Sequence, residues 1–158
     1  MNVYSLALLA TALHAAPHPN PTDGGEYRGA ERQLAVQLPR VAEAAVRIDG
    51  SLDEEVWSRA ALLTGFTQTE PVEGAPASER TEVRVFYTPQ ALYVGVHAFA
   101  KDPSRIRSSL AERDRILRDD HVQILLDTFL DRRRAFAFYV NPLGIQQDGI
   151  LNEGSARR

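Results

Sequence analysis

Apolar residues recur at every second position along several stretches of this chain, and a period of two is that of a β-strand. Residues 82–88 and 91–100 both alternate in this way, and Pro89 and Gln90 between them favour a turn. The two stretches together predict a β-hairpin with one apolar face. A long amphipathic helix would instead repeat every 3.6 residues, and the sequence contains no uninterrupted stripe of that kind.

A second hairpin is predicted further along the chain. Residues 121–128 and 134–141 alternate on either side of a polar turn at 129–133, and residues 145–151 are expected to add one more strand. Two short helices are expected, over residues 53–61, where Asp53 would be the N-cap, and from Pro103 to about Leu110. Many short strands with little helix predict an all-β fold, an antiparallel β-sandwich with one or two short helices.

The N-terminal 33 residues predict an exported protein with a linker before its folded domain. Residues 1–16 carry no charge and end in a run of small apolar side chains, as a signal peptide does, although no Lys or Arg precedes that run. Residues 17–33 are rich in Pro and Gly and are expected to form a linker, so the folded domain is expected over 34–158. The predicted location is the periplasm, the outer membrane or the extracellular space.

Composition narrows the function classes. A chain of 158 residues is long enough for one domain, and its lack of cysteine excludes thiolate catalysis, disulfides and Cys-ligated zinc. A net charge of −3 argues against nucleic acid as a partner, because such domains are usually strongly basic.

Four motifs carry a family resemblance. The run from Val46 to Ala60, VRIDGSLDEEVWSRA, resembles the opening signature of the family 9 carbohydrate-binding modules. Three later elements are similar to that family and follow in its order: Leu92-Tyr93-Val94, the run DDHVQILLD at 119–127 and the run FYVNPLG at 138–144. The resemblance covers about residues 44–152.

The resemblance implies a β-sandwich of jelly-roll type that binds polysaccharide or oligosaccharide without cutting it. It also implies the N-terminal module of a longer exported protein whose remainder is an outer-membrane β-barrel. Since modules of that branch continue with further strands, the sandwich is expected to be incomplete at its C-terminus. The alternatives are an interaction domain that docks on such a barrel without binding sugar, and part of a glycosyl hydrolase, although no catalytic residue is assigned.

The candidate sugar-binding residues are Tyr139, Arg134 and Asn141. Sugar rings present C–H faces to aromatic side chains and hydroxyls to polar ones, and these three residues are expected to project together from one strand. The only tryptophan, Trp57, belongs to the opening signature and is expected in the core. Tyr93, Phe99, Gln146 and Gln147 are further candidates.

A structural calcium ion is a further expectation. Calcium takes oxygen ligands from carboxylates and carbonyls in loops, and Asp102, Asp119 and Asp120 are the residues expected to supply them. A glycosidase would need two carboxylates about 5–9.5 Å apart, and nothing in the sequence distinguishes such a pair.

Overall fold

The computed structural model describes residues 23–110 and 112–152. They form two compact units, one within residues 23–101 and the other from Asp102 onward. Each unit contains one β-sheet, and the remaining regular structure consists of short 3₁₀ helices, so the predicted all-β class is confirmed. Packing of the two sheets as a jelly-roll sandwich stays a prediction.

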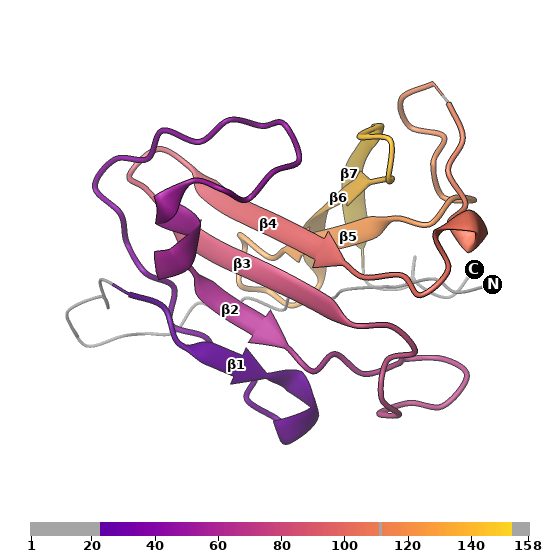
Figure 1. Cartoon of the computed structure of the whole chain (residues 1–158), viewed down its shortest axis with the longest axis horizontal. Helices are drawn as coiled ribbons and strands as arrows, with labels where there is room; N and C mark the ends of the chain where they lie inside the picture. Colours follow the sequence, from indigo (N-terminus) through magenta and orange to yellow (C-terminus); the bar gives the residue numbers. More distant parts are fainter. Residues whose placement is uncertain (1–22, 111, 153–158) are drawn as a thin grey trace. The chain divides into compact units, whose positions relative to one another are not determined.

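The first unit contains a four-stranded sheet in which spatial order follows sequence order (Figure 1). Its strands are β1 (Glu26–Arg28), β2 (Ala61–Thr64), β3 (Thr81–Tyr87) and β4 (Leu92–Ala98). The pairing is parallel between β1 and β2 and antiparallel elsewhere. The hairpin β3–β4 confirms the first predicted hairpin.

The alternation that predicted this hairpin reappears in its register. Val83 pairs with Val96 and Val85 with Val94, so the branched apolar side chains share one face of the sheet. Val83 and Val85 are fully buried. The opposite face carries Phe86, which is also fully buried.

Aromatic side chains build the core on that opposite face. Trp57 contacts Phe86 edge to face with ring centroids 5.1 Å apart, and Tyr93 stacks on Phe86 at 4.7 Å. Trp57 is 5% exposed, which confirms its predicted place in the core. It is carried by a 3₁₀ helix, η2 (Glu55–Arg59), where the sequence predicted a helix over residues 53–61.

A carboxylate fixes the indole of Trp57. Glu54, and not the expected Asp53, is the N-cap residue of η2. Its carboxylate accepts hydrogen bonds from Trp57 Nε1 at 3.0 Å and from the backbone N–H of Arg47 at 2.9 Å. The bond from Arg47 is the main cause that holds the pKa of Glu54 below its ordinary value.

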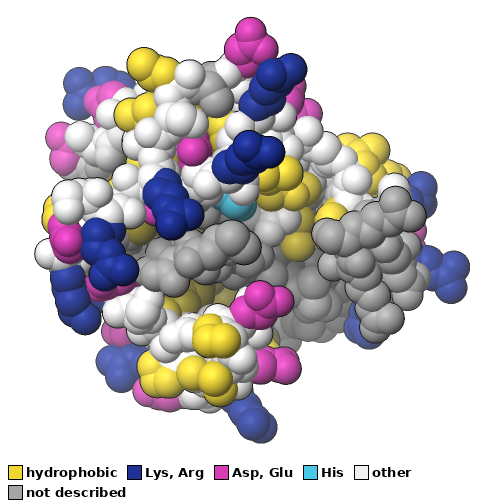
Figure 2. Space-filling view, turned by 90° about the vertical axis from the view of Figure 1, so that its right-hand side faces the viewer, with side chains coloured by type: hydrophobic (Ala, Val, Ile, Leu, Met, Phe, Trp, Pro, Cys, Tyr) yellow, Lys and Arg dark blue, Asp and Glu magenta, His cyan; other side chains and the backbone are white. Residues whose placement is uncertain are grey.

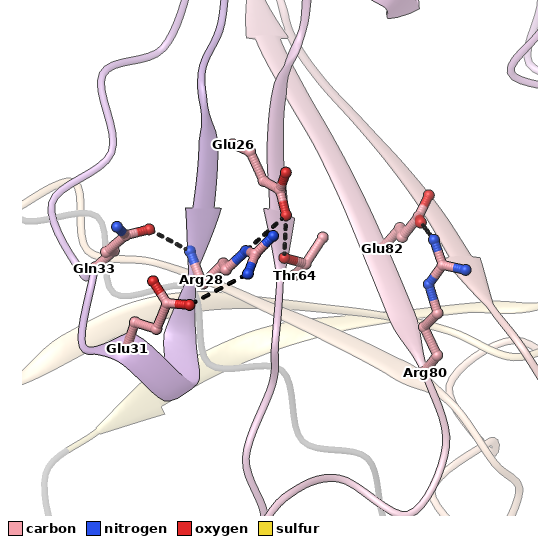
Figure 3. Close-up of polar contacts among 7 residues, drawn as sticks. All are labelled: Glu26, Arg28, Glu31, Gln33, Thr64, Arg80 and Glu82. Carbon is pink, nitrogen blue, oxygen red and sulfur yellow. Dashed lines mark hydrogen bonds and ion pairs between the residues drawn. The ribbon is translucent and has the colours of Figure 1, made fainter.

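Part of the predicted linker is ordered, because β1 and the 3₁₀ helix η1 (Gly29–Glu31) lie within residues 17–33. Glu26 accepts hydrogen bonds from Arg28 Nε at 3.0 Å and from Thr64 of β2 at 3.2 Å (Figure 3). Before β1, Gly24 donates its N–H to the Arg59 carbonyl, and a side chain there would overlap the Ala61 backbone. The predicted signal peptide, residues 1–16, lies outside the described residues.

The second unit contains a three-stranded antiparallel sheet in the order β5-β6-β7. Its strands are β5 (Val122–Leu126), β6 (Arg134–Val140) and β7 (Gln146–Asn152). The hairpin β5–β6 confirms the second predicted hairpin, and β7 confirms the additional strand. The helix expected from Pro103 is shorter than predicted, since η3 is Pro103–Arg105.

Surface charge is mixed. Figure 2 shows basic and acidic side chains scattered among one another on the face that it presents, with hydrophobic side chains between them. Within residues 23–110 and 112–152, no helix has the length and apolar character needed to span a membrane.

Candidate functional site

The register of β6 separates the residues that were expected to bind sugar. Tyr139 pairs with Gln123 on one side and Gln147 on the other, whereas Arg134 pairs with Asn152 at the far end of the strand. Because side chains alternate along a strand and these two positions differ by five, Arg134 and Tyr139 lie on opposite faces of the sheet. The three expected side chains therefore do not form one patch.

Local partners hold Arg134 on its own face. Its guanidinium forms an ion pair with Asp131 at 3.1 Å and lies 4.3 Å from the centre of the Phe129 ring. The Phe129 ring stacks in turn on Phe136 at 5.9 Å. Arg134 thus closes the turn between β5 and β6.

Tyr139 lies in the middle of a row that crosses all three strands. Gln123 on β5 and Gln147 on β7 occupy the paired positions on either side of it, on the same face. Gln123 Nε2 donates to the Tyr139 hydroxyl at 2.9 Å, and the His121 ring meets the Tyr139 ring edge to face at 5.6 Å. The row Gln123–Tyr139–Gln147 is called the amide–tyrosine row below.

The row is anchored at its β7 end. The side-chain oxygen of Gln147 accepts a hydrogen bond from the backbone N–H of Ile116 at 3.4 Å, and Ile116 itself is fully buried. All three side chains of the row are half-buried. A half-buried aromatic ring between two carboxamides combines a flat apolar surface with hydrogen-bond donors and acceptors.

Asn141, the third residue expected to bind sugar, is buried in a network of hydrogen bonds. It is 3% exposed, and its Oδ1 accepts hydrogen bonds from the backbone N–H groups of Leu143 at 3.0 Å and Ile145 at 2.9 Å. Its Nδ2 donates to Asp119 at 3.0 Å and to the Ser109 carbonyl at 3.3 Å. The Oδ1 end of the amide therefore holds the turn before β7, and the Nδ2 end holds the segment before β5.

Asp119 is the charged member of this network. Its carboxylate accepts hydrogen bonds from the backbone N–H of Ser109 at 3.0 Å and from the Ser109 hydroxyl at 2.9 Å. The backbone bond from Ser109, followed by the bond from Asn141, holds the pKa of Asp119 below its ordinary value of 3.8. A carboxyl that stays ionised in this way suits a structural anchor, whereas a general acid needs a raised pKa.

The lowered pKa predicts acid sensitivity. The stabilisation from Asp119 is present above the ordinary pKa of 3.8 and is lost as the pH falls through the lower, folded-state value. In urea unfolding between neutral and acidic pH, Asp119→Asn should be less stable than wild type at neutral pH and should depend less on pH. Glu112→Gln, a change at an exposed residue of the same unit, serves as the control and should keep the wild-type slope. Equal slopes for all three proteins would contradict this assignment.

The acids expected to bind calcium accept hydrogen bonds from backbone and hydroxyl groups of the protein. Asp102 Oδ1 accepts hydrogen bonds from the N–H of Ser104 at 3.1 Å and from its hydroxyl at 2.6 Å, and Asp120 accepts from the N–H of Arg107 at 2.9 Å. Among the described residues, no group of three or more His, Cys, Asp or Glu side chains could hold a metal ion. A structural calcium ion stays a prediction, and the function proposed below does not depend on it.

The sequence did not identify Gln123 as a candidate binding residue, and it did not distinguish Gln146 from Gln147. The register distinguishes the last two, because Gln147 pairs with Tyr139 while Gln146 pairs with Val140 on the opposite face. Which residues of β5 and β7 pair with Tyr139 depends on where each hairpin turns, and the folded structure shows this. Tyr93 packs on Phe86 in the core, and Phe99 stacks on His97 at 4.1 Å in the other unit.

The chain was compared with known families, proteins and structures. No protein-family model, no curated protein and no solved structure matched the chain. The likeness to family 9 carbohydrate-binding modules therefore rests on the four sequence motifs.

Proposed function

We propose that the chain is a non-catalytic carbohydrate-binding module of an exported cell-envelope protein, and that the amide–tyrosine row is its sugar-binding surface. The row itself is the observation that carries the proposal, since it places one aromatic ring between two carboxamides on one face of a sheet. A pyranose can stack a C–H face on the Tyr139 ring while its equatorial hydroxyls reach an amide on either side.

The shape of the row favours a saccharide chain over a single captured ring. The row crosses the sheet at right angles to the strands, and neighbouring strands lie about 4.8 Å apart, so three strands span about 10 Å. That length matches roughly two consecutive sugar units. A single stacking ring contributes little binding free energy, so we expect the affinity for a saccharide chain to be weak.

The first experiment is calorimetric titration of the chain with xylan and cellulose oligosaccharides. Saturable heat is expected, and Tyr139→Ala should weaken binding about tenfold or more, which corresponds to about 1.4 kcal/mol for the loss of one stacking ring. Circular dichroism of both proteins checks that they are folded. Saturable heat that is unchanged in Tyr139→Ala would contradict the assignment of the surface.

Arg134→Ala provides the matched control. Arg134 lies on the same strand and was an equal candidate from the sequence, yet its side chain is on the other face. We expect it to leave saccharide binding unchanged. Loss of binding in Arg134→Ala with retention in Tyr139→Ala would move the binding surface to the opposite face.

A second candidate function is an interaction domain. The face of β5–β7 opposite the amide–tyrosine row exposes Phe138, Val140 and Ile150, with exposed fractions of 42%, 40% and 59%. Contiguous exposed apolar side chains of this kind often mark an interaction surface. A folded chain that gives no heat with any saccharide would favour this function, with an outer-membrane β-barrel as the proposed partner.

A further inference from the structure

Strand β4 forms one edge of the four-stranded sheet, and the hydrogen bonds around it show which of its backbone groups point outward. Thr88 donates to Ala91 at 2.8 Å at the turn, and Phe99 donates to Arg80 at 2.9 Å at the other end. In an antiparallel ladder, hydrogen-bonded and non-bonded pairs alternate. The residues of β4 whose backbone groups point away from β3 are therefore Leu92, Val94, Val96 and Ala98.

These outward groups form a continuous unused edge. Among the described residues, no backbone hydrogen bond outside the β3–β4 ladder involves any of the four. The strand Leu-Tyr-Val-Gly-Val-His-Ala contains no Lys, Arg, Asp, Glu or Pro. Proteins commonly protect an edge with charges, prolines or very short strands, and an edge without them is a template for another strand.

The opposite edge of the same sheet is protected. Strand β1 has three residues, and the charged pair Glu26 and Arg28 stands on it (Figure 3). The contrast indicates that β4 is the edge of this sheet suited to pairing.

A depression lies next to Val96 and His97 of β4, and residues 50–53 form its other wall. Leu52 of this loop covers the face of the strand, because its side chain lies 2.6 Å from the position that a Cβ on Gly95 would take. A Cβ projects from the face of a sheet, while the unused N–H and C=O groups lie in its plane.

We propose that β4 pairs antiparallel with β4 of a second copy of this chain, about a two-fold axis at Gly95. This register overlaps all seven residues and places Val94 opposite Val96 of the second copy, both with outward backbone groups. It also places Tyr93 opposite His97 and Leu92 opposite Ala98. The two four-stranded sheets then become one sheet of eight strands.

A second copy is the occupant that the strand itself favours. Since β4 has no charged side chain, two identical strands meet without like charges opposite one another. The two-fold register pairs β-branched with β-branched and aromatic with imidazole side chains, both of which suit cross-strand neighbours. A closed two-fold pairing also uses the same edge on both chains and leaves no further copy of that edge to propagate.

Sedimentation velocity across a wide concentration range, combined with amide hydrogen exchange, tests the pairing. A mass that rises to twice that of one chain is expected, with the Val94 and Val96 amides gaining protection as the concentration rises. The Gly95 amide, which bonds to β3, should be protected at all concentrations. Monomeric mass throughout, with fast exchange at Val94 and Val96, would overturn the proposal.

Two variants at one position separate the backbone edge from the side chain. Val96→Pro removes the outward N–H without breaking a bond to β3 and should weaken the dimer at least about tenfold. Val96→Ala shortens the side chain and keeps the N–H, so it should still dimerise. If Val96→Pro fails to fold, Ala98→Pro removes another outward N–H at the end of the strand and should also weaken the dimer. A dimer that survives a folded proline variant unchanged would place the interface elsewhere and overturn the proposal.

Discussion

Phe86→Ala is expected to lower the free energy of unfolding by about 3–5 kcal/mol, the range found when a buried aromatic side chain is truncated. Phe86 is fully buried and lies between Trp57 and Tyr93, so its removal deprives two other rings of their contact and leaves a cavity that the stiff sheet cannot close. Since a domain of this size is stable by about 5–15 kcal/mol, the variant should be largely destabilised or unfolded.

The measurement is urea unfolding followed by tryptophan fluorescence. Trp57 is the only tryptophan, and its ring centroid lies 5.1 Å from that of Phe86, so the signal reports on the affected unit. Phe138→Ala is the matched control, because the same truncation is made at a side chain that is 42% exposed. It should cost much less, and its fluorescence transition should stay near that of wild type. Equal losses at the two positions would contradict the assigned core.

Asn141→Ala is the second large effect, with an expected loss of about 1–3 kcal/mol for each buried group left without a partner. The change removes the acceptor for Leu143 and Ile145 and the donor to Ser109 and Asp119. Because the turn of the β6–β7 hairpin depends on these bonds, faster amide exchange is expected at Leu143 and Ile145. Unfolding followed by far-ultraviolet circular dichroism measures the overall loss.

Asn141→Asp gives a sharper version of this test. An aspartate keeps the two acceptor bonds, but it replaces the donor to Asp119 with a second carboxylate at a site where the atoms lie 3.0 Å apart. Two carboxylates at this distance repel, and protonation of one relieves the repulsion. Asn141→Asp should therefore recover stability relative to wild type as the pH is lowered. A constant difference at all pH values would mean that Asn141 and Asp119 are not coupled.

The strands with a strong period of two were predictable from the sequence, and the short strand β1 was not. The hairpins β3–β4 and β5–β6 have many apolar residues in alternation and short connections. Strand β1 is Glu-Tyr-Arg, three residues without an apolar pattern, and its pairing partner Leu62 lies far along the chain. Its order depends on Glu26, Arg28 and Thr64, whose meeting no local pattern indicates.

The candidate site was predictable in part. Tyr139 was identified as an aromatic residue on a strand, and counting positions from it would have placed Arg134 on the other face. The neighbours of Tyr139 depend on register, which the turn geometry determines and which the sequence pattern alone left open. The burial of Asn141 was not predicted, because a polar residue after a strand suggests an exposed ligand, whereas here its side chain pairs with backbone groups of the turn.

The parallel pairing of β1 with β2 has a kinetic consequence. The hairpins β3–β4, β5–β6 and β6–β7 join strands through short turns, and such local contacts form quickly during folding. Glu26 and Thr64 are 38 residues apart, so β1 must close a long loop before any of its contacts are made. We therefore expect the N-terminal strand to dock last and to be the first part of its sheet to detach. A slow phase confined to the β1 amides in pulse-labelled hydrogen exchange would report that final step.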